Sequence, residues 1–438
     1  MLNINSKTKY LLLIGILLIT TILWLFTKIS IENTNVLTNP LENLAQLLGL
    51  LAVNFFAINF ILATRFYFIE SLFGGLDKMY KFHKMIARIA FTLAWAHPLF
   101  ILMDRFRGIE SIQRYFLPGN SDRLNFGIFA LYVMTLLVLL SLTKFLPYHI
   151  WKNSHRLMVI VMVFVLIHLI NPTGTLSSNF LLYIWTLGFI AISILCWIYI
   201  EFLYKRIGPV FYYKLSKISN LGEVNELYFE PQNKPMIYSA GQFTFLSFLK
   251  NKSITQELHP YTISSNPHEY YLRISAKNLG DYSSTLSNAK EGDIVKLIGP
   301  YGHFTRDRLI NNKKQIWIAG GIGVTPFLSM LAAEKDEPSG NNIHFYYSTK
   351  TLEDSVYRAE IQKDAENFPD LTIKFNTDSE DGYLSAKKIV EDINYDIKDA
   401  YVLICGPTQM MYALRKQFIE LGLNSKQIIF EDFALKPV

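Results

Sequence analysis

Six long apolar stretches, separated by polar connections, occupy the first half of the chain. Each is close to the roughly 17–25 residues that a helix needs to cross a bilayer. They lie at about residues 10–29, 41–66, 82–103, 125–146, 154–170 and 179–203. The pattern predicts an α-helical six-span membrane bundle over residues 1–206, with an uncleaved first span and both ends of the chain on one side.

The pattern changes after Gly208 and Pro209, which interrupt the chain. From 210 to 308, short runs of alternating apolar and polar residues are separated by turns, as in QFTFLSF and DIVKLIG. These runs predict an antiparallel β-barrel domain over residues 207–310. From 313 onward, apolar strands alternate with helical segments, which predicts an α/β doubly wound nucleotide domain over residues 311–438.

The composition fits a chain that lies partly in lipid. Of its 438 residues, 51% are hydrophobic and 18% are charged, against roughly 25% charged residues in an ordinary soluble domain. The formal net charge of +6 does not indicate a nucleic-acid partner, because basic residues beside membrane spans account for it. The two cysteines, Cys196 and Cys405, exclude a disulfide framework and a cysteine-ligated iron–sulfur or zinc site.

Basic residues in the connections predict the orientation of the bundle. One side carries more lysine and arginine than the other and is expected to face the cytoplasm. The richer side holds Lys7, Lys9, Arg65, Lys78, Lys81, Lys84, Lys144, Lys152, Arg156, Lys205 and Arg206, and the other holds Lys28, Arg105, Arg107, Arg114 and Arg123. The sequence thus predicts a multi-pass protein of the cell membrane with cytoplasmic N- and C-termini.

Four histidines lie in the apolar stretches as two pairs. His83 and His97 are 14 residues apart in the third stretch, and His155 and His168 are 13 apart in the fifth. At about 1.5 Å per residue, the members of each pair are roughly 20 Å apart along a helix. Two such helices side by side would offer one facing pair of imidazoles near each membrane surface. Because imidazole is a common axial ligand of haem iron, we expect two b-type haems, an inner one at His83 and His155 and an outer one at His97 and His168.

A simpler interpretation of these histidines stays open. Fourteen residues return a helix to within about 40° of the same face, but thirteen leave it about 140° away. A bulge, a kink or a ring rotation would therefore be needed at His155 or His168. Core histidines bonded to backbone carbonyls would give the same pattern, although four at matched spacings favour metal ligands.

Two segments of the expected barrel carry groups suited to a flavin. The stretch HPYTISS supplies a ring that could stack and hydroxyls that could bond a ribityl or phosphate chain, although it also reads as an ordinary strand. Its members are His259, Pro260, Tyr261, Thr262, Ile263, Ser264 and Ser265. A predicted turn into a helix holds Gly280, Ser283, Ser284 and Thr285. Backbone amides at a helix start suit a pyrophosphate, although a plain helix cap has the same sequence.

Three segments of the expected nucleotide domain follow its strands. The stretch GGIGVTP lies between an apolar strand and a helix, which is the context for a dinucleotide, and includes Gly320, Gly321, Gly323, Thr325 and Pro326. Cys405, Gly406 and Pro407 end a later strand, where ligands sit in such sheets, although a tight turn with a buried thiol is the alternative. Ser348, Thr349 and Lys350 could bind a 2′-phosphate, which favours NADPH over NADH, although a solvated turn explains them almost as well.

In combination, these motifs resemble the ferric reductase and NADPH oxidase superfamily over nearly all of residues 40–438. The resemblance implies that HPYTISS contacts FAD, that GGIGVTP contacts the nicotinamide dinucleotide and that Cys405 lies beside the nicotinamide ring. It also implies that Phe433 stacks on the flavin. The family shares the thirteen-residue spacing, which implies a common local irregularity of the helix that turns both histidines to the same face. The chain departs from animal oxidases in continuing five residues past Phe433 and in having Ile101 where they carry a further histidine. EF-hand repeats are absent from the sequence, which argues against direct calcium control.

The predicted enzyme is thus an NAD(P)H oxidase or ferric reductase-type flavocytochrome b. It would move electrons from cytosolic NADPH, with NADH as the alternative donor, through FAD and two b-type haems to an acceptor across the membrane. Oxygen, giving superoxide, is marginally preferred because the sequence names no acceptor pocket. A ferric or cupric chelate and an extracytoplasmic protein partner are the alternatives.

Overall fold

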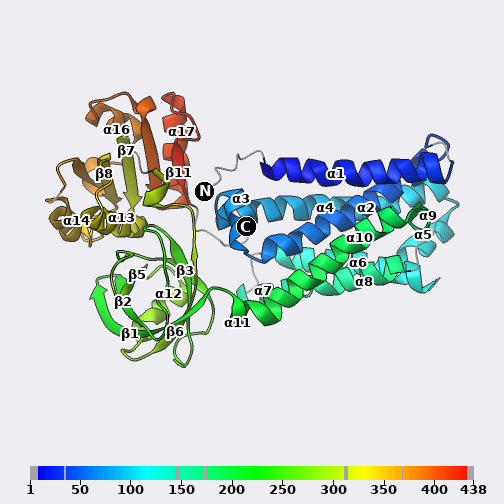
Figure 1. The fold of residues 1–438 in the computed structure, drawn as a ribbon, viewed down its shortest axis with the longest axis horizontal. Coiled ribbons are helices and arrows are strands. Elements are labelled where there is room, and N and C mark those ends of the chain that lie inside the picture. Colours follow the sequence, from blue (N-terminus) through cyan, green and yellow to red (C-terminus); the bar gives the residue numbers. More distant parts are fainter. Residues whose placement is uncertain are drawn as a thin grey trace. The chain divides into compact units, whose positions relative to one another are not determined.

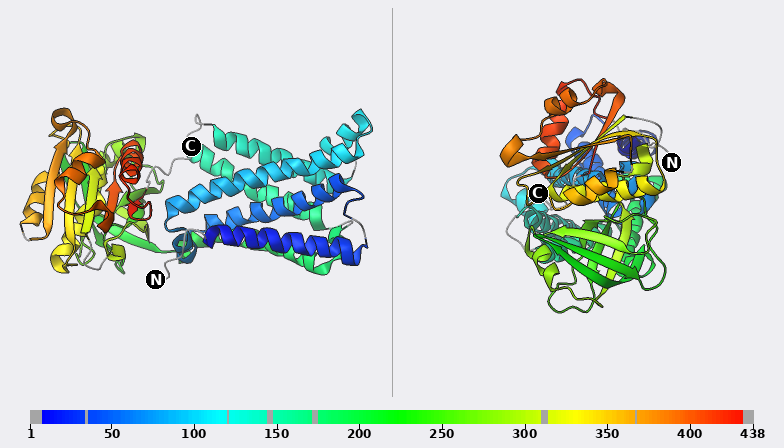
Figure 2. Two further views of the ribbon diagram at one scale, coloured as in Figure 1. Left: turned by 90° about the horizontal axis from the view of Figure 1, so that it is seen from above. Right: turned by 90° about the vertical axis from the view of Figure 1, so that its left-hand side faces the viewer.

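The computed structural model describes residues 8–33, 36–119, 121–143, 148–170, 175–309, 314–366 and 368–431. The chain divides into two compact units, one that extends to Arg206 and one that begins at Ile207. Figures 1 and 2 show the first as a bundle of long helices and the second as two sheets with accompanying helices. We refer to them as the helical bundle and the two-sheet module.

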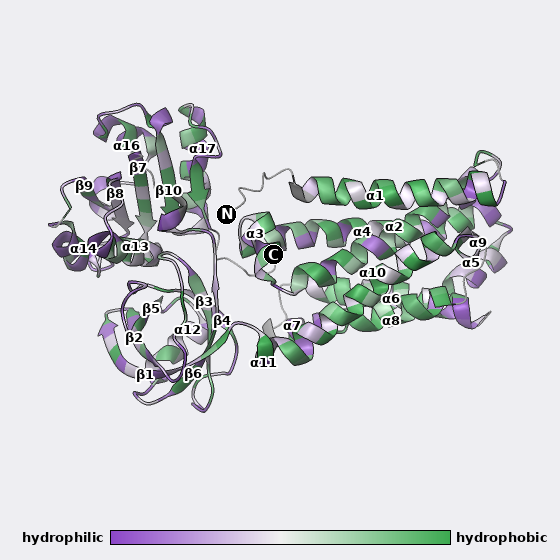
Figure 3. Ribbon diagram, in the orientation of Figure 1, coloured by the Kyte–Doolittle hydropathy of each residue, from purple (hydrophilic) through white to green (hydrophobic). Residues whose placement is uncertain are grey.

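Within the described residues, six helical segments are long and apolar enough to cross a membrane, as the hydrophobic pattern predicted. Five of the spans are built on α1 (Thr8–Phe26), α2 (Pro40–Ala63), α4 (Leu76–Arg105), α6 (Asp122–Leu142) and α10 (Phe180–Ile198). The remaining span combines α7 (Tyr148–Arg156) and α8 (Met158–Ile170). Shorter helices lie at α3 (Tyr67–Phe73), α5 (Ile109–Phe116), α9 (Thr175–Ser178) and α11 (Tyr204–Ile207). Apolar residues run along the long helices, and hydrophilic residues gather near their ends (Figure 3).

The bundle is held together by apolar packing and a few interhelical hydrogen bonds. Helix α2 packs against α4 and α10, and α6 packs against α7 and α8. The Asn54 amide of α2 and the Trp185 indole of α10 both donate to the Thr20 hydroxyl of α1, at 2.9 and 3.0 Å. Because lipid offers no hydrogen bonds, such polar groups have to find partners inside the protein.

The fifth span is interrupted between its two histidines. Leu157 separates α7 from α8, and its N–H donates to the Ser154 carbonyl at 3.0 Å, while the Ile160 N–H donates to the Leu157 carbonyl at 2.9 Å. These three-residue hydrogen bonds wind the chain at about 120° per residue instead of about 100°. The extra rotation reduces the mismatch between His155 and His168, so the irregularity expected there is present.

The first sheet of the module is an antiparallel barrel. Its strands are β1 (Val210–Leu221), β2 (Val224–Pro231), β3 (Phe243–Phe248), β4 (His259–Thr262), β5 (Leu272–Lys277) and β6 (Ile294–Tyr301), in the spatial order β4-β3-β6-β1-β2-β5. An isolated bridge between Ile263 and Ile274 links the two end strands and closes the sheet. The predicted antiparallel barrel is therefore confirmed.

The second sheet is parallel, with helices on both faces. Its strands are β7 (Lys314–Gly320), β8 (Asn342–Thr349), β9 (Leu371–Thr377), β10 (Ala400–Cys405) and β11 (Ile428–Phe430), in the order β11-β10-β7-β8-β9. Trp317 of β7 packs with α13 (Thr325–Asp336) and α14 (Arg358–Ala365), whereas its neighbours Ile316 and Ile318 pack with α16 (Ala386–Asp392) and α17 (Thr408–Glu420). This alternation fills both faces and confirms the predicted doubly wound domain.

Candidate functional site

The outer histidines His97 and His168 each form a hydrogen bond to a main-chain carbonyl of a neighbouring helix. His97 Nδ1 lies 2.7 Å from the Ala45 carbonyl of α2, and His168 Nδ1 lies 2.8 Å from the Arg123 carbonyl of α6. A carbonyl can only accept, so both Nδ1 atoms carry the proton and both Nε2 atoms keep a free lone pair. The two rings also lie close enough to interact electrostatically. The outer pair thus has the carbonyl bonds that the core-histidine alternative named, and these bonds leave both Nε2 atoms free to bind a metal.

The inner histidines His83 and His155 face each other. Their ring centroids are 6.2 Å apart, with the ring planes inclined by 63°. His155 Nδ1 lies 3.2 Å from the Ser141 hydroxyl, whose own hydrogen is donated to the Leu137 carbonyl at 2.7 Å. The hydroxyl therefore accepts from His155, and Nε2 is again the free nitrogen.

The two inner rings are held less firmly than the outer ones. His83 Nδ1 is buried without a hydrogen bond of good geometry, although the Asn59 carbonyl of α2 lies in its vicinity. Trp151, one turn before His155, stacks on the His155 ring with centroids 5.6 Å apart. The inner pair therefore relies on one hydroxyl and one aromatic contact, where the outer pair uses two carbonyls.

Three aromatic rings gather at the strand that carries HPYTISS. His259 of β4 stacks on Tyr282 of α12 (Asp281–Thr285), with ring centroids 3.6 Å apart and planes within 19°. Tyr261, two residues further along β4, is half-buried, and burial together with the nearby Tyr282 hydroxyl raises its pKa. Burial, with a smaller effect from Glu257, raises the pKa of Tyr282. The Tyr282 hydroxyl is buried and has no hydrogen-bond partner within the described residues.

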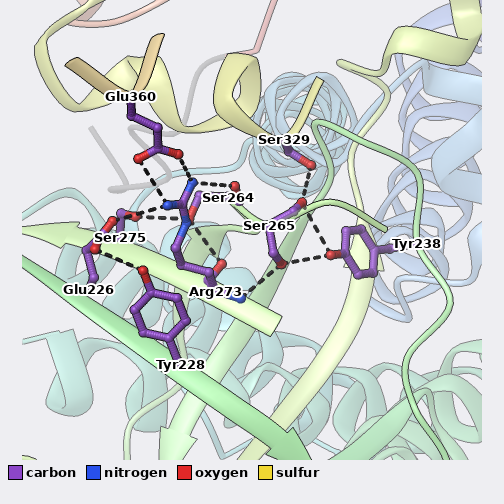
Figure 4. A network of polar contacts seen from close by, with 9 residues as sticks. All are labelled: Glu226, Tyr228, Tyr238, Ser264, Ser265, Arg273, Ser275, Ser329 and Glu360. Carbon is purple, nitrogen blue, oxygen red and sulfur yellow. Dashed lines mark hydrogen bonds and ion pairs between the residues drawn. The ribbon is translucent and has the colours of Figure 1, made fainter. Parts of the chain in front are cut away.

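The serines of the same motif connect the barrel to the nucleotide sheet (Figure 4). The Ser265 hydroxyl pairs with that of Tyr238 at 2.8 Å and accepts the Arg273 N–H at 2.9 Å. The Ser265 carbonyl accepts the hydroxyl of Ser329, in α13, at 2.6 Å. Ser264 is fully buried, and its hydroxyl lies 2.9 Å from that of Ser275. The two serine hydroxyls predicted to bind a flavin chain are therefore already bonded within the protein.

The predicted pyrophosphate turn forms as a capped helix start. The Ser283 hydroxyl accepts the Leu279 and Gly280 N–H groups at 2.9 and 3.0 Å. The Ser284 and Thr285 hydroxyls each donate to a carbonyl three residues earlier. These contacts match the helix-cap alternative, and a phosphate at this turn stays a prediction.

The GGIGVTP and CGP segments lie in direct contact. A side chain at Gly320 would come within 2.8 Å of Pro407, and one at Gly406 within 3.0 Å of Gly320. Gly321 has a φ of +54°, in the left-handed region that favours glycine. Thr325 and Pro326 then open helix α13, where proline is well tolerated. The glycines therefore allow the ends of β7 and β10 to approach closely, as at a nucleotide-binding edge.

Cys405 and Glu431 form a buried pair beside this edge. Burial, reinforced by the Glu431 carboxylate, raises the pKa of the Cys405 thiol, so the thiol stays protonated near neutral pH. A side chain at Gly302 would come within 2.9 Å of the Glu431 carboxylate, so Gly302 makes room for it. Sequence reasoning found Cys405 from its motif but missed Glu431, which no local motif marks.

The Ser348–Lys350 segment ends strand β8 next to an acidic turn. The Ser348 hydroxyl donates to the Asp378 carboxylate at 3.0 Å, and the Asn376 amide donates to the same oxygen at 3.1 Å. The Thr349 hydroxyl donates to the Thr351 carbonyl, and Lys350 is exposed. Both hydroxyls are thus occupied. The other predicted contact, Phe433, lies outside the described residues.

Family comparisons agree with this division of the chain. Residues 48–166 match the family described as ferric reductase like transmembrane component. Residues 210–304 match an FAD-binding domain, and residues 317–416 match an oxidoreductase NAD-binding domain. The chain has the domain architecture of the ferric reductase and NADPH oxidase superfamily. It combines six helices that are long and apolar enough to cross a membrane, counted over the described residues, with an FAD-binding domain and an oxidoreductase NAD-binding domain.

Individual relatives match only part of the chain. Flavohemoprotein A of Dictyostelium discoideum is 30% identical over 234 residues, which is 50% of this chain and 58% of the relative. Sulfhydrogenase 2 subunit gamma of Pyrococcus furiosus is 29% identical over 185 residues, 39% of this chain and 64% of the relative. The chain thus spans less than two thirds of these relatives.

One solved structure has a related fold. The flavohemoglobin of Malassezia yamatoensis with bound FAD and heme aligns with a TM-score of 0.52 and 18% identity, covering 90% of this chain and 96% of its own. At this identity the likeness concerns the fold alone.

Proposed function

We propose that this reductase transfers electrons from a cytosolic nicotinamide dinucleotide through FAD and two b-type haems to an acceptor on the other side of the membrane. The observation that carries the proposal is the arrangement of four intramembrane histidines as two pairs, at least three of them with Nδ1 engaged and Nε2 available. Bound flavin would convert a two-electron donor into single electrons, and bound haem would carry those electrons across the apolar layer.

The inner pair fits a haem iron by distance. Metal–imidazole bonds of about 2 Å would let two imidazoles whose centroids are about 6 Å apart bind one metal between them. The His83 and His155 centroids are 6.2 Å apart.

The ligand count points to the same group. Within the described residues, no cluster of three or more histidine, cysteine, aspartate or glutamate side chains could hold a metal ion. A metal bound by two histidines alone needs its other ligands from elsewhere, and a porphyrin supplies four. The four histidines would thus hold two haems, His83 with His155 and His97 with His168, through imidazoles that are uncharged when neutral.

The aromatic cluster of the barrel fits a flavin. His259, Tyr261 and Tyr282 present half-buried rings, and the Tyr282 hydroxyl is a buried polar group with no partner within the described residues. Such a group costs free energy unless a ligand satisfies it. We propose that Tyr261 and Tyr282 contact the flavin and its chain, that Ser264 and Ser265 position β4, and that Phe433 stacks on the ring.

For the nucleotide, the GGIGVTP and CGP segments would hold the nicotinamide half, with Cys405 protonated beside it. The phosphate preference is better argued from Asp378, which binds Ser348. A carboxylate that follows β9, at the carboxyl edge of the sheet and beside the end of β8, suits a ribose 2′-hydroxyl and repels a 2′-phosphate. We therefore propose NADH as the donor, with NADPH, which the sequence favoured, as the alternative.

The orientation follows from the loop charges, with both termini in the cytoplasm and His97 and His168 on the far side. Arg123, whose Nε donates to the His168 carbonyl at 3.3 Å, adds a positive charge beside the outer pair. A cation there would favour an anionic product such as superoxide or an anionic ferric chelate as substrate. We retain oxygen as the first acceptor, with a chelate or an extracytoplasmic protein partner as alternatives.

The decisive experiment measures NADH and NADPH consumption by the purified protein in lipid, with and without oxygen. Consumption that stops without oxygen, together with cytochrome c reduction blocked by superoxide dismutase, would support the oxidase. Sustained anaerobic turnover with ferric citrate would instead establish a chelate reductase. A haem-free protein would overturn the electron route itself.

A further inference from the structure

The two outer histidine rings rest on glycines as well as on carbonyls. A Cβ at Gly49 of α2 would lie 2.9 Å from Nδ1 of His97, and one at Gly127 of α6 would lie 2.9 Å from Nδ1 and Cε1 of His168. Real Cβ atoms essentially never approach a ring so closely, so alanine at either position has to displace the ring. Each ring thus lies against its neighbouring helix at a glycine, where no side chain separates the ring from the backbone.

Each outer histidine ring contacts one carbonyl and one glycine of a neighbouring helix, which we call its seat, and the two seats have the same spacing on different helices. On α2, the carbonyl that accepts His97 Nδ1–H belongs to Ala45, four residues before Gly49. On α6, the carbonyl that accepts His168 Nδ1–H belongs to Arg123, four residues before Gly127. Four residues are about one helical turn, so the carbonyl and the glycine lie on one face, one above the other.

Each seat fixes both the direction and the electronic character of its imidazole. The carbonyl holds Nδ1–H, which leaves Nε2 as the ligand nitrogen and makes it more basic. The missing side chain allows the ring to come near enough for that hydrogen bond, at 2.7 and 2.8 Å. An added methyl group would push the ring off the carbonyl and weaken both effects.

From this geometry we propose that Gly49 and Gly127 are positioning residues of the outer haem site, setting ligand orientation and the redox potential of the outer iron. The inference rests on the proposed di-haem function. It concerns the outer pair alone, because Gly49 and Gly127 have their Cβ positions against His97 and His168. The two sites should therefore respond differently to a Gly→Ala substitution.

The test compares the full-length variants Gly49→Ala, Gly127→Ala and Gly188→Ala in lipid nanodiscs. Gly188 is the matched control, because it lies in the membrane helix α10 and its Cβ would meet nothing within 4 Å. Haem content, optical redox titration and low-spin ferric spectra are recorded for each. Flavin content and flavin reduction by NADH show that each variant is folded.

A less basic, misdirected imidazole stabilises ferric iron less well, so the outer potential should rise. We expect Gly49→Ala and Gly127→Ala to shift one of the two haem potentials to more positive values or to lose that haem, and the affected haem should be the one that His97→Ala removes. The other haem, and both haems of Gly188→Ala, should titrate as in the wild type.

The outcomes separate this inference from the function on which it rests. If the wild type holds two haems and the Gly49→Ala and Gly127→Ala variants have unchanged haem potentials, the positioning role of the two glycines is refuted while the di-haem function stands. A wild type without haem would overturn the proposed function. If one variant cannot be purified, the other decides, because it changes a different helix and a different ring.

Discussion

The helical bundle and the two-sheet module use polar side chains in different ways. In the bundle, His97 has one hydrogen bond to one carbonyl, and its neighbours along the helix are apolar. In the module, Ser265 alone contacts Tyr238, Arg273 and Ser329. Helices in lipid satisfy their own main chain and expose few polar groups, whereas strands and turns in a water-facing domain bring many together. A substitution in the bundle should therefore have a confined effect, and one in the module a distributed effect.

The largest expected effect is that of His97→Ala. It removes one of the two proposed ligands of the outer haem, so this haem should be lost and electron transfer across the membrane should stop. Flavin reduction by NADH should continue, because the module is unchanged. Haem content by pyridine haemochrome and stopped-flow flavin reduction provide the measurement. His168→Ala should reproduce the result, and an unchanged haem-to-protein ratio would refute the ligand assignment.

Arg273→Ala should have the next largest effect, on stability. The Arg273 guanidinium is mostly buried and bonds both carboxylate oxygens of Glu360, at 2.7 and 3.2 Å. Removing one partner of a fully buried ion pair costs about 3–5 kcal/mol. Because the Glu360 side chain is 36% exposed and the buried partner, Glu226, is 3.5 Å away, we expect a smaller loss of about 2–3 kcal/mol. Urea unfolding followed by flavin fluorescence should show this loss, while haem content stays normal.

Lys416→Ala is the matched control for that experiment. Lys416 pairs with Glu420 at 3.8 Å on the exposed surface of α17. Such pairs contribute about 0–1 kcal/mol. If Arg273→Ala destabilised the module no more than this control, the network around Ser264 and Ser265 would not be what holds the barrel to the nucleotide sheet.

The same contrast explains which parts of the molecule the sequence could predict. Helical periodicity and apolar length locate the six spans and the histidine pairs, because both depend on spacing along a single chain segment. The spacing of His155 and His168 predicted an irregularity between them, but not its location at Leu157, since that depends on how α7 and α8 pack. Likewise, Gly49 and Gly127 look like ordinary membrane glycines until the rings that lie against them are known.

In the module, motifs identified the right segments but not the role of each side chain. HPYTISS was found, yet its serines turn inward to α13 and Arg273. Tyr282 and Glu431 were missed because their importance arises from contacts with residues distant in the sequence. The register of strand pairing decides which face of the sheet a side chain occupies, and a single sequence does not state which strand is the pairing partner.

Asp378→Asn should have a moderate effect, confined to donor choice. Losing the negative charge beside Ser348 should weaken the bond to a ribose 2′-hydroxyl and remove repulsion from a 2′-phosphate. We expect the ratio of kcat/KM for NADH to that for NADPH to fall about tenfold, which corresponds to about 1.4 kcal/mol. Steady-state flavin-linked turnover with both donors measures it. Glu380→Gln, a charge change on the exposed face of the same turn, is the control, and an equal response in both variants would remove Asp378 from donor selection.

Ser141→Ala should produce the smallest effect. It tests whether a substitution in the bundle affects only the nearest histidine pair, at the weakest of the histidine contacts. The Ser141 hydroxyl accepts the His155 Nδ1–H at 3.2 Å, a longer bond than those of the outer pair. Because Trp151 also holds the His155 ring, loss of the hydroxyl should leave the inner haem bound. The inner potential should rise slightly, by less than Gly49→Ala raises the outer one, and the outer potential should not move.

Ser193→Ala provides the comparison, because the Ser193 hydroxyl bonds only within α10, to the Ile190 carbonyl at 2.8 Å. A redox titration in which Ser141→Ala and Ser193→Ala coincide would mean that the hydroxyl does not tune the inner site. A shift of both haems by Ser141→Ala would be more consequential. It would mean that the two levels of the bundle are electronically or structurally coupled, and that the bundle, like the module, distributes its polar interactions.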